Sequence, residues 1–256
     1  MLKNESTCIK SYDDKLIKSW SSEFRMLNKA NLKSIESVEI LELVAVISRA
    51  CMLVTTNKYG LRDTQVIAVL TFIDSMLNST GGRLANISTG EGKSLITVST
   101  AISQLMLFDG SVDILTSSEV LAERDAAESQ SMFSKFGIKV SCNCDAAADN
   151  NETLRRERYE NNHVIYGEIG HFQRDLLLTK YYGKDIRMKN ATCLIVDEVD
   201  SMCIDNMCNT LYISHQIADL RYMSDIFVYI WQAVNAHDTG IYSIQNVKKV
   251  YYFNKR

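Results

Sequence analysis

Residues 89–94 read Thr-Gly-Glu-Gly-Lys-Ser and are the first whose types and spacing could do chemistry. Glycines let backbone N–H groups curl around phosphate oxygens, and a helix that begins at this point adds partial positive charge. Lys93 can then reach the β and γ phosphates, and Ser94 can ligate Mg²⁺. The segment predicts a phosphate-binding loop, although Ile87 stands where the full motif has its first glycine.

A second pattern lies about 100 residues further along, where Cys193–Val196 is fully apolar and is followed by Asp197 and Glu198. A strand buried on both faces that ends in two acids suits Mg·ATP hydrolysis. Asp197 can hold Mg²⁺, and Glu198 can orient and deprotonate the attacking water. Either pattern alone could be a chance turn, but together they predict a nucleotide site.

The elements that must position these residues alternate along the chain. Strands that alternate with helices predict an α/β fold with a mostly parallel sheet covered on both faces. After residue 214 the pattern changes to a helix and a hairpin. The expected helices are 12–54, 65–77, 95–108, 119–136, 152–160 and 223–236; the expected strands are 83–87, 112–116, 139–142, 164–166 and 193–196, with hairpin strands at 242–244 and 250–253.

Composition excludes several classes of protein. The 256 residues carry 28 Lys and Arg against 31 Asp and Glu, a net charge of −3, so no bulk basic field points to nucleic acid or an anionic membrane. No apolar run approaches 18 residues, so no transmembrane segment is expected. The polar residues 1–18 lack the apolar core of a signal peptide. These features predict a soluble chain that is not exported.

The remaining reactive side chains have simpler interpretations. Seven cysteines and four histidines match no familiar zinc spacing, which predicts reduced thiols filling small apolar spaces. His171 and His215 are expected at the surface or in packing rather than as metal ligands. The charged cluster Arg155–Arg158 is expected to form a solvated helix face, with nucleic-acid contact as the weaker interpretation.

Several stretches resemble one family, the SecA preprotein translocase motors. Residues 86–94 resemble that family's Met-Lys-Thr-Gly-Glu-Gly-Lys-Thr, and residues 115–125 resemble its Thr-Val-Asn-Asp-Tyr-Leu-Ala-x-Arg-Asp. Residues 166–175 are similar to its Tyr-Gly stretch, and Val196–Ser201 is shared almost intact. The tail, residues 224–251, resembles the start of the inserted preprotein-crosslinking domain.

The resemblance implies a RecA-like, DEAD-like nucleotide-binding domain that uses ATP and Mg²⁺. It implies a helical segment at 1–55, the motor domain at 56–215 and a crosslinking-like segment at 216–256. A preprotein and a membrane translocation channel would be the partners, and the chain would be cytoplasmic or peripheral at the membrane. By resemblance, the nucleotide contacts are Gln65 on adenine together with Thr89, Gly90, Glu91, Gly92, Lys93 and Ser94; the Mg²⁺ ligands are Ser94 and Asp197; the catalytic residues are Lys93 and Glu198.

Departures from the family pattern are few. Ser88 replaces a basic residue, and Glu168 and His171 replace a Thr and a Glu. Cys208 and Thr210 replace an Arg and a Pro. We expect phosphate and Mg²⁺ binding to survive these changes, whereas the coupling of ATP use to a substrate is expected to be more sensitive to them.

Two other functions stay open. A nucleic-acid helicase with the same type of ATPase domain would carry Asp-Glu-Ala-Asp or Asp-Glu-x-His and a row of basic residues that binds the nucleic-acid strand. Residues 197–200 instead read Asp-Glu-Val-Asp. A non-catalytic relic of the motor would keep the fold alone. In the family an arginine on a second RecA-like domain completes the site. Without such an arginine, which can contribute ~10³-fold or more in related enzymes, hydrolysis is expected to be slow.

Overall fold

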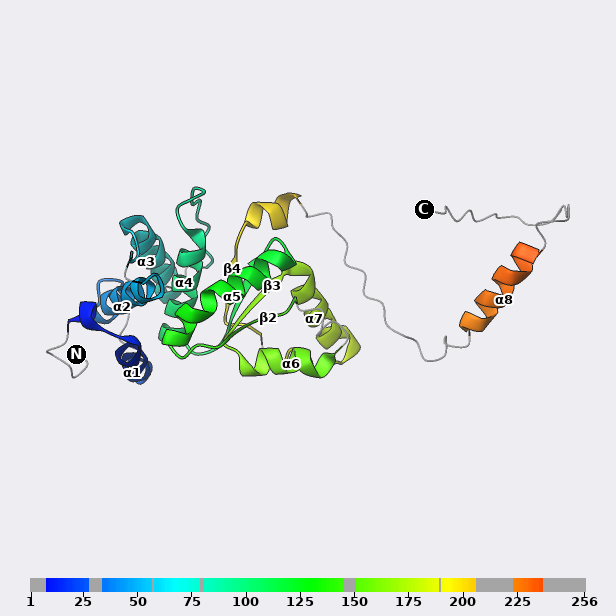
Figure 1. Cartoon of the computed structure of the whole chain (residues 1–256), viewed down its shortest axis with the longest axis horizontal. Coiled ribbons are helices and arrows are strands. Elements are labelled where there is room, and N and C mark those ends of the chain that lie inside the picture. The colour runs from blue at the N-terminus through cyan, green and yellow to red at the C-terminus, as the bar shows by residue number, and fades with distance from the viewer. Residues whose placement is uncertain are drawn as a thin grey trace. The chain divides into compact units, whose positions relative to one another are not determined.

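A computed structural model gives the fold of the chain, which divides into two units, Met1–Leu211 and Tyr212–Arg256; Figure 1 labels the described helices and strands. In the second unit it describes one helix, α8 (Met223–Ala236), which confirms the helix predicted there. The predicted hairpin lies outside the described residues, and the three-part domain division stays a prediction. The described segments are 8–27, 34–56, 58–78, 81–144, 151–188, 190–205 and 223–236.

The first unit contains a four-stranded sheet in which every pairing is parallel. Its spatial order is β2 (Val140–Cys142), β3 (Val164–Glu168), β1 (Val112–Thr116) and β4 (Cys193–Val196). All five residues of β1 are buried. Short, largely apolar strands of this kind are typical of parallel sheets with both faces covered. The predicted α/β fold class and the strands predicted at these four places are confirmed.

Alternate side chains of the strands enter two hydrophobic clusters on opposite faces of the sheet. Ile114 and Tyr166 belong to the large core, which they share with α4 (Lys93–Leu107) and α5 (Glu119–Lys135). Their neighbours Leu115 and Ile165 belong to the smaller cluster with Phe172. Phe172 lies on α7 (Ile169–Tyr182), so helices cover both faces (Figure 1).

The amino-terminal helices are part of the same large core. A short 3₁₀ turn, η1 (Ile9–Ser11), precedes α1 (Asp14–Arg25), which the side chain of Asp13 caps. α2 (Val38–Val54) and α3 (Asp63–Asn78) follow. The described residues of the predicted helical region 12–54 therefore form two helices, α1 and α2. Fully buried side chains from these three helices join the core: Ile17, Phe24, Ile40, Leu43, Ile47 and Ile73.

The prediction of a strand at residues 83–87 is wrong. The segment has no regular structure and pairs with none of the described strands. Leu84 is 82% exposed, and Ile87 is the one residue of the five that packs against the core. β4 forms an edge of the described sheet, where Leu194 is 57% exposed. The apolar side chains of residues 83–87 and of β4 are therefore less buried than their character suggests. β4 is held by its pairing with β1. Residues 83–87 pair with none of the described strands, and a short apolar run without such a partner gains too little to hold an extended backbone.

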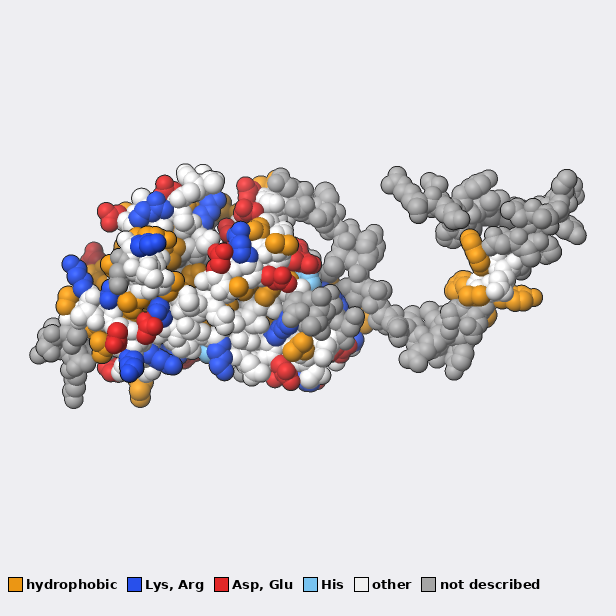
Figure 2. Space-filling view, viewed as in Figure 1, with side chains coloured by type: hydrophobic (Ala, Val, Ile, Leu, Met, Phe, Trp, Pro, Cys, Tyr) orange, Lys and Arg blue, Asp and Glu red, His pale blue; other side chains and the backbone are white. Residues whose placement is uncertain are grey.

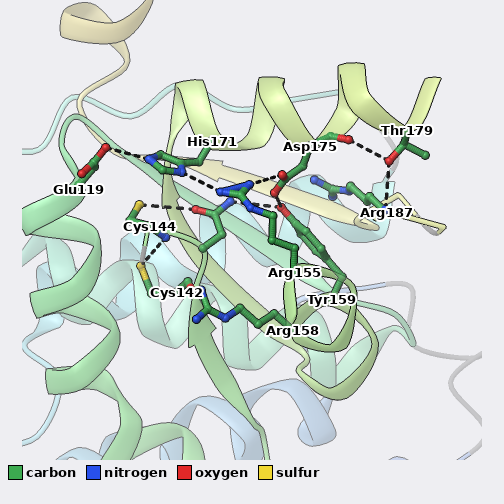
Figure 3. Close-up of polar contacts among 11 residues, drawn as sticks. Glu119, Cys142, Cys144, Arg155, Arg158, Tyr159, His171, Asp175, Thr179 and Arg187 are labelled. Atoms are coloured by element: carbon green, nitrogen blue, oxygen red, sulfur yellow. Dashed lines mark hydrogen bonds and ion pairs between the residues drawn. The ribbon is translucent and has the colours of Figure 1, made fainter. Parts of the chain in front are cut away.

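The prediction of a solvated face at Arg155–Arg158 is wrong for Arg155, whereas Glu157 is exposed and Arg156 and Arg158 are half-buried. The cluster lies on α6 (Glu152–Asn161), where Arg155 is 2% exposed and forms an ion pair with Asp175, which is fully buried (Figure 3). The hydroxyl of Tyr159 donates to the other oxygen of Asp175 at 2.7 Å. Arg158 donates to the backbone carbonyl of Cys142 at 2.8 Å. This face of α6 is turned toward β2 and α7, and helical charge spacing cannot show which way a face is turned.

The buried ion pair gives a test of this packing. Asp175→Ala would leave the Arg155 guanidinium buried without its carboxylate, and we expect a loss of about 3 kcal/mol in the free energy of unfolding. Urea denaturation measures this loss. As a control, Glu152→Ala removes a surface ion pair with Lys184 and should cost less than about 1 kcal/mol. Equal effects of the two variants would contradict the buried arrangement.

Candidate nucleotide-binding site

The loop that enters α4 turns through two glycines with positive φ. Gly90 has φ +85°, and Gly92, which caps α4, has φ +78°; L side chains rarely adopt this region. Because α4 begins at Lys93, its first backbone N–H groups have no partner within the helix. These groups and the helix dipole favour a bound anion. Thr89, Gly90 and Ser94 are exposed, so the loop is open to a ligand.

Gln65 holds this loop from the side of α3. Its side chain is buried, and its amide nitrogen donates to the carbonyl of Glu91 at 2.8 Å. Its amide oxygen accepts from the backbone N–H of Arg62 at 3.0 Å. A Cβ on Gly92 would lie 2.5 Å from the Gln65 amide nitrogen, so the close approach requires glycine there. The structure thus shows Gln65 as a support of the loop, and its contact with adenine stays a prediction.

Asp197 and Glu198 follow directly after β4. The N–H of Asp197 donates to the carbonyl of Leu115 at 2.9 Å, so pairing with β1 continues past the strand. Burial raises the pKa of Asp197, the charge of Glu198 raises it further, and the charge of Lys93 lowers it. Lys93 therefore lies within electrostatic reach of Asp197. Two motifs that are distant in sequence meet at one end of the sheet.

A cavity of about 280 Å³ is lined mainly by residues of α2, α4 and α5, and both predicted Mg²⁺ ligands, Ser94 and Asp197, are among them. Residues 89–93 and Glu198 do not line it. No described group of three or more His, Cys, Asp or Glu side chains could hold a metal ion by itself. Mg²⁺ usually takes one or two carboxylates and completes its shell with phosphate oxygens and water. A carboxylate and a hydroxyl on one cavity wall fit that requirement.

A larger cavity of about 460 Å³ lies on the other side of the loop, between α3 and the irregular segment 83–88. Of the predicted site residues, Glu91 is the one that lines it. It contains neither Ser94 nor Asp197, the predicted Mg²⁺ ligands, which both line the smaller cavity; Lys93 lines neither of the two. We therefore place the chemistry at the smaller cavity, on the identity of its lining residues rather than on size.

Glu198 has an unusual backbone. Its φ of +58° lies in the left-handed region, which is costly for a residue with a side chain. The Ser117 hydroxyl donates to one Glu198 carboxylate oxygen at 2.8 Å. Ser117 follows β1, and Glu198 follows the neighbouring strand β4. Strain held at the position predicted to activate water is an arrangement found at functional sites.

Sequence reasoning missed three neighbours of the site. Arg62 donates to the carbonyl of Gly90 at 3.3 Å and pairs with Glu91 at 3.4 Å. Ser117 holds Glu198, and the charge of Asp125 raises the pKa of Asp197. Asp125 ends the stretch that resembles the family's Arg-Asp segment, a usable signal. Arg62 and Ser117 carry no signal in a single sequence, because their roles depend on how separate segments meet.

Comparison with known proteins decides the family. A model of the SecA DEAD-like domain matches residues 2–247, nearly the whole chain. The chain belongs to the SecA DEAD-like domain family. The loop at 89–94 and the acids Asp197 and Glu198 both lie within the matched region, so the SecA family assignment covers both halves of the site.

Individual SecA relatives are moderately similar and much longer. The chain is 28% identical to the protein translocase subunit SecA of Campylobacter curvus over 79% of its length, which is 22% of that relative. It is 29% identical to the SecA of Mycoplasma mobile, over 95% of this chain and 28% of that relative. It is 35% identical to the SecA of Wolinella succinogenes, over 52% of this chain and 15% of that relative. The chain thus spans less than a third of the length of each SecA protein.

The described surface bears on the other functions. On the face shown in Figure 2, acidic and basic side chains of the described residues are interspersed, with no continuous basic track of the kind that follows a nucleic-acid backbone. Among the described helices, none has the length and apolar character needed to cross a bilayer. The six described cysteines are free thiols, and two of them, Cys8 and Cys203, are exposed rather than buried in apolar spaces as predicted.

The strained backbone at Glu198 predicts that glycine at this position stabilises the fold. Glu198→Gly should raise the free energy of unfolding by about 0.5–1 kcal/mol, because glycine adopts the left-handed region without steric cost. Asp200→Gly, in the same segment but at a residue without positive φ, should lower it. Chemical denaturation of both variants measures the difference. If Glu198→Gly destabilises the chain as much as Asp200→Gly does, Glu198 is not strained.

Proposed function

We propose that the chain is the nucleotide-binding motor domain of a SecA-type protein translocase, and that it binds Mg·ATP where the loop at 89–94 meets Asp197. One observation carries the proposal: Ser94 and Asp197 line one cavity while the charge of Lys93 acts on Asp197. Phosphate and Mg²⁺ need a cation, a hydroxyl and a carboxylate within a few ångströms of one another. Membership of the SecA family supports the choice of ATP.

Each residue of the loop has a role in this proposal. The backbone N–H groups of residues 89–94 surround the phosphate oxygens, and the Lys93 ammonium neutralises the β and γ phosphates. The hydroxyl of Ser94 and the carboxylate of Asp197 hold Mg²⁺, which offsets charge on those phosphates when it is bound. Gln65 keeps the loop in shape through Glu91 and contacts adenine.

Glu198 is the residue that activates water in this proposal. Its carboxylate keeps one oxygen on the Ser117 hydroxyl, which fixes the direction of the other. An ionised carboxylate there can orient a water molecule and accept its proton during attack on the γ phosphate. We propose that an arginine from a second domain completes the site.

The names of the relatives, protein translocase subunits, support a cellular role in protein transport. We propose that ATP binding and hydrolysis in this domain are coupled to the movement of a preprotein through a membrane channel. The chain would then work in the cytoplasm or peripherally at the membrane. The interspersed surface charges in Figure 2 favour this role over that of a nucleic-acid helicase.

Titration with a fluorescent ATP analogue in the presence of Mg²⁺ tests the proposal. Lys93→Ala removes a charge-assisted contact worth about 1.5–3 kcal/mol, so the Kd should rise about 10-fold or more. Asp197→Asn should abolish most of the Mg²⁺ dependence of binding. The weaker binding that is measured in the absence of Mg²⁺ should remain. Lys18→Ala, which removes an exposed lysine of α1, is the matched control and should bind as the wild type does.

The outcomes separate the alternatives. Binding that depends on Lys93, Asp197 and Mg²⁺ supports the proposed site. Equally weak binding by the wild type and Lys93→Ala would overturn it and leave a chain that keeps the fold without the nucleotide function. Tight binding that is indifferent to both substitutions would place the nucleotide elsewhere.

A further inference from the structure

Two cysteines at the carboxyl end of β2 lie against each other, outside the nucleotide site. Cys142 is the last residue of β2, Asn143 lies in a bend, and Cys144 follows (Figure 3). The Cys144 backbone N–H donates to the Cys142 sulfur at 3.4 Å. The bend therefore places the Cys142 sulfur against the backbone of Cys144.

The surroundings favour the thiolate of Cys142. Its sulfur accepts from the backbone N–H of Cys144, and the Arg158 guanidinium is held nearby by the Cys142 carbonyl. The thiol of Cys144 contributes most to lowering the pKa of Cys142, with help from the amide and Arg158 and against burial and the charge of Glu123. Cys142 is half-buried, so small reagents can reach it.

Cys144 has the opposite character. It is 4% exposed, and its sulfur accepts from the Glu168 backbone N–H at 3.3 Å. Its thiol lies 3.5 Å from the side-chain oxygen of Asn143. The neighbouring Cys142 side chain and burial both raise the pKa of Cys144. The pair thus combines an accessible nucleophile with a buried neighbour that keeps its proton.

We propose that Cys142 and Cys144 form an oxidative modification site that closes to a reversible disulfide with low-molecular-weight disulfides such as oxidised glutathione. The Cys142 thiolate attacks one sulfur of glutathione disulfide, which gives a mixed disulfide and releases a glutathione thiolate. Cys144 then attacks the Cys142 sulfur, passes its proton to that thiolate and expels the second glutathione. Two protein thiols are oxidised, and one glutathione disulfide is reduced to two thiols.

The geometry makes the bond possible and labile. Two residues of extended chain span at most about 7 Å between Cα atoms, and the bend at Asn143 shortens this span toward the range that disulfides bridge. A loop this short gains little stabilisation from closure, so thiols should reduce the bond readily.

Closure would also change the junction between β3 and α7. The Cys144 sulfur holds the Glu168 N–H, and the Glu168 side chain caps α7 by accepting from Gly170 at 2.7 Å. A Cβ on Gly167 would lie 2.0 Å from the Asn143 side-chain oxygen, so the two segments are tightly packed. Oxidation at 142–144 would thereby act on the start of α7.

Peptide mapping tests the site on the wild-type chain. Incubation with glutathione disulfide at neutral pH is followed by alkylation and trypsin, which leaves both sulfurs on the peptide 140–155. We expect this peptide to lose two hydrogens and to resist alkylation until dithiothreitol is added. Cys8, an exposed thiol alone on its tryptic peptide, is the internal control and should give only a glutathione adduct.

Two variants assign the roles. Cys144→Ser should stop at the glutathione adduct on Cys142, and Cys142→Ser should form an adduct about 10-fold more slowly. In urea this difference should vanish, because it depends on the fold. If peptide 140–155 remains fully alkylated when Cys8 is completely modified, or if the folded variants react at equal rates, the proposal is wrong. Neither result depends on ATP binding.

Discussion

The parallel pairing of β1 with β4 is the constraint on which the site depends. Its register places Leu115 opposite Val196, so the residues that follow each strand emerge side by side. Ser117 therefore reaches Glu198, and Asp197 continues the ladder onto Leu115. Carboxyl ends of parallel strands form the usual ligand edge of an α/β sheet. A shift of one residue would turn the acids to the wrong faces.

The amino-terminal helices supply the other half of this arrangement. α4 must bring its first turn to the edge where β4 ends, and it is held there by a core shared with α1, α2 and α3. Gln65 and Arg62, at the start of α3, fasten the loop itself. These helices thus share one continuous core with the sheet and with α4 and α5, and the loop depends on helices that come before it in the sequence.

The site costs stability in ways that ligands can offset. The pKa of Asp197 is raised in the fold, so the folded chain holds that proton more tightly than the unfolded chain does. This contribution to stability is present at low pH and is lost as the pH rises through the folded pKa. At neutral pH the ionised, partly buried carboxylate lowers the free energy of unfolding, and a bound cation would offset this loss. The strained backbone of Glu198 lowers the free energy of unfolding further.

Much of the fold followed from the sequence because its strands are apolar and its motifs have a physical purpose. Val112–Thr116 and Cys193–Val196 could be assigned from hydrophobicity, and residues 89–94 from phosphate chemistry. The strand expected at 83–87 failed because a local pattern cannot tell whether a neighbouring strand is there to pair with. The burial of Arg155 was missed for a related reason: its partner Asp175 lies on another helix, and charge spacing alone indicated a solvated face.

The central claim is that Lys93, Ser94 and Asp197 meet around one Mg²⁺–nucleotide site, and a paramagnetic metal measures this directly. With Mn²⁺ and ADP in place of Mg·ATP, amide resonances near the metal broaden in an NMR spectrum. The account predicts the strongest broadening at Ser94 and Asp197, little at distant Gly183, and loss of the pattern when ADP is omitted. Broadening centred on other carboxylates, or an unchanged pattern in Lys93→Ala, would contradict it.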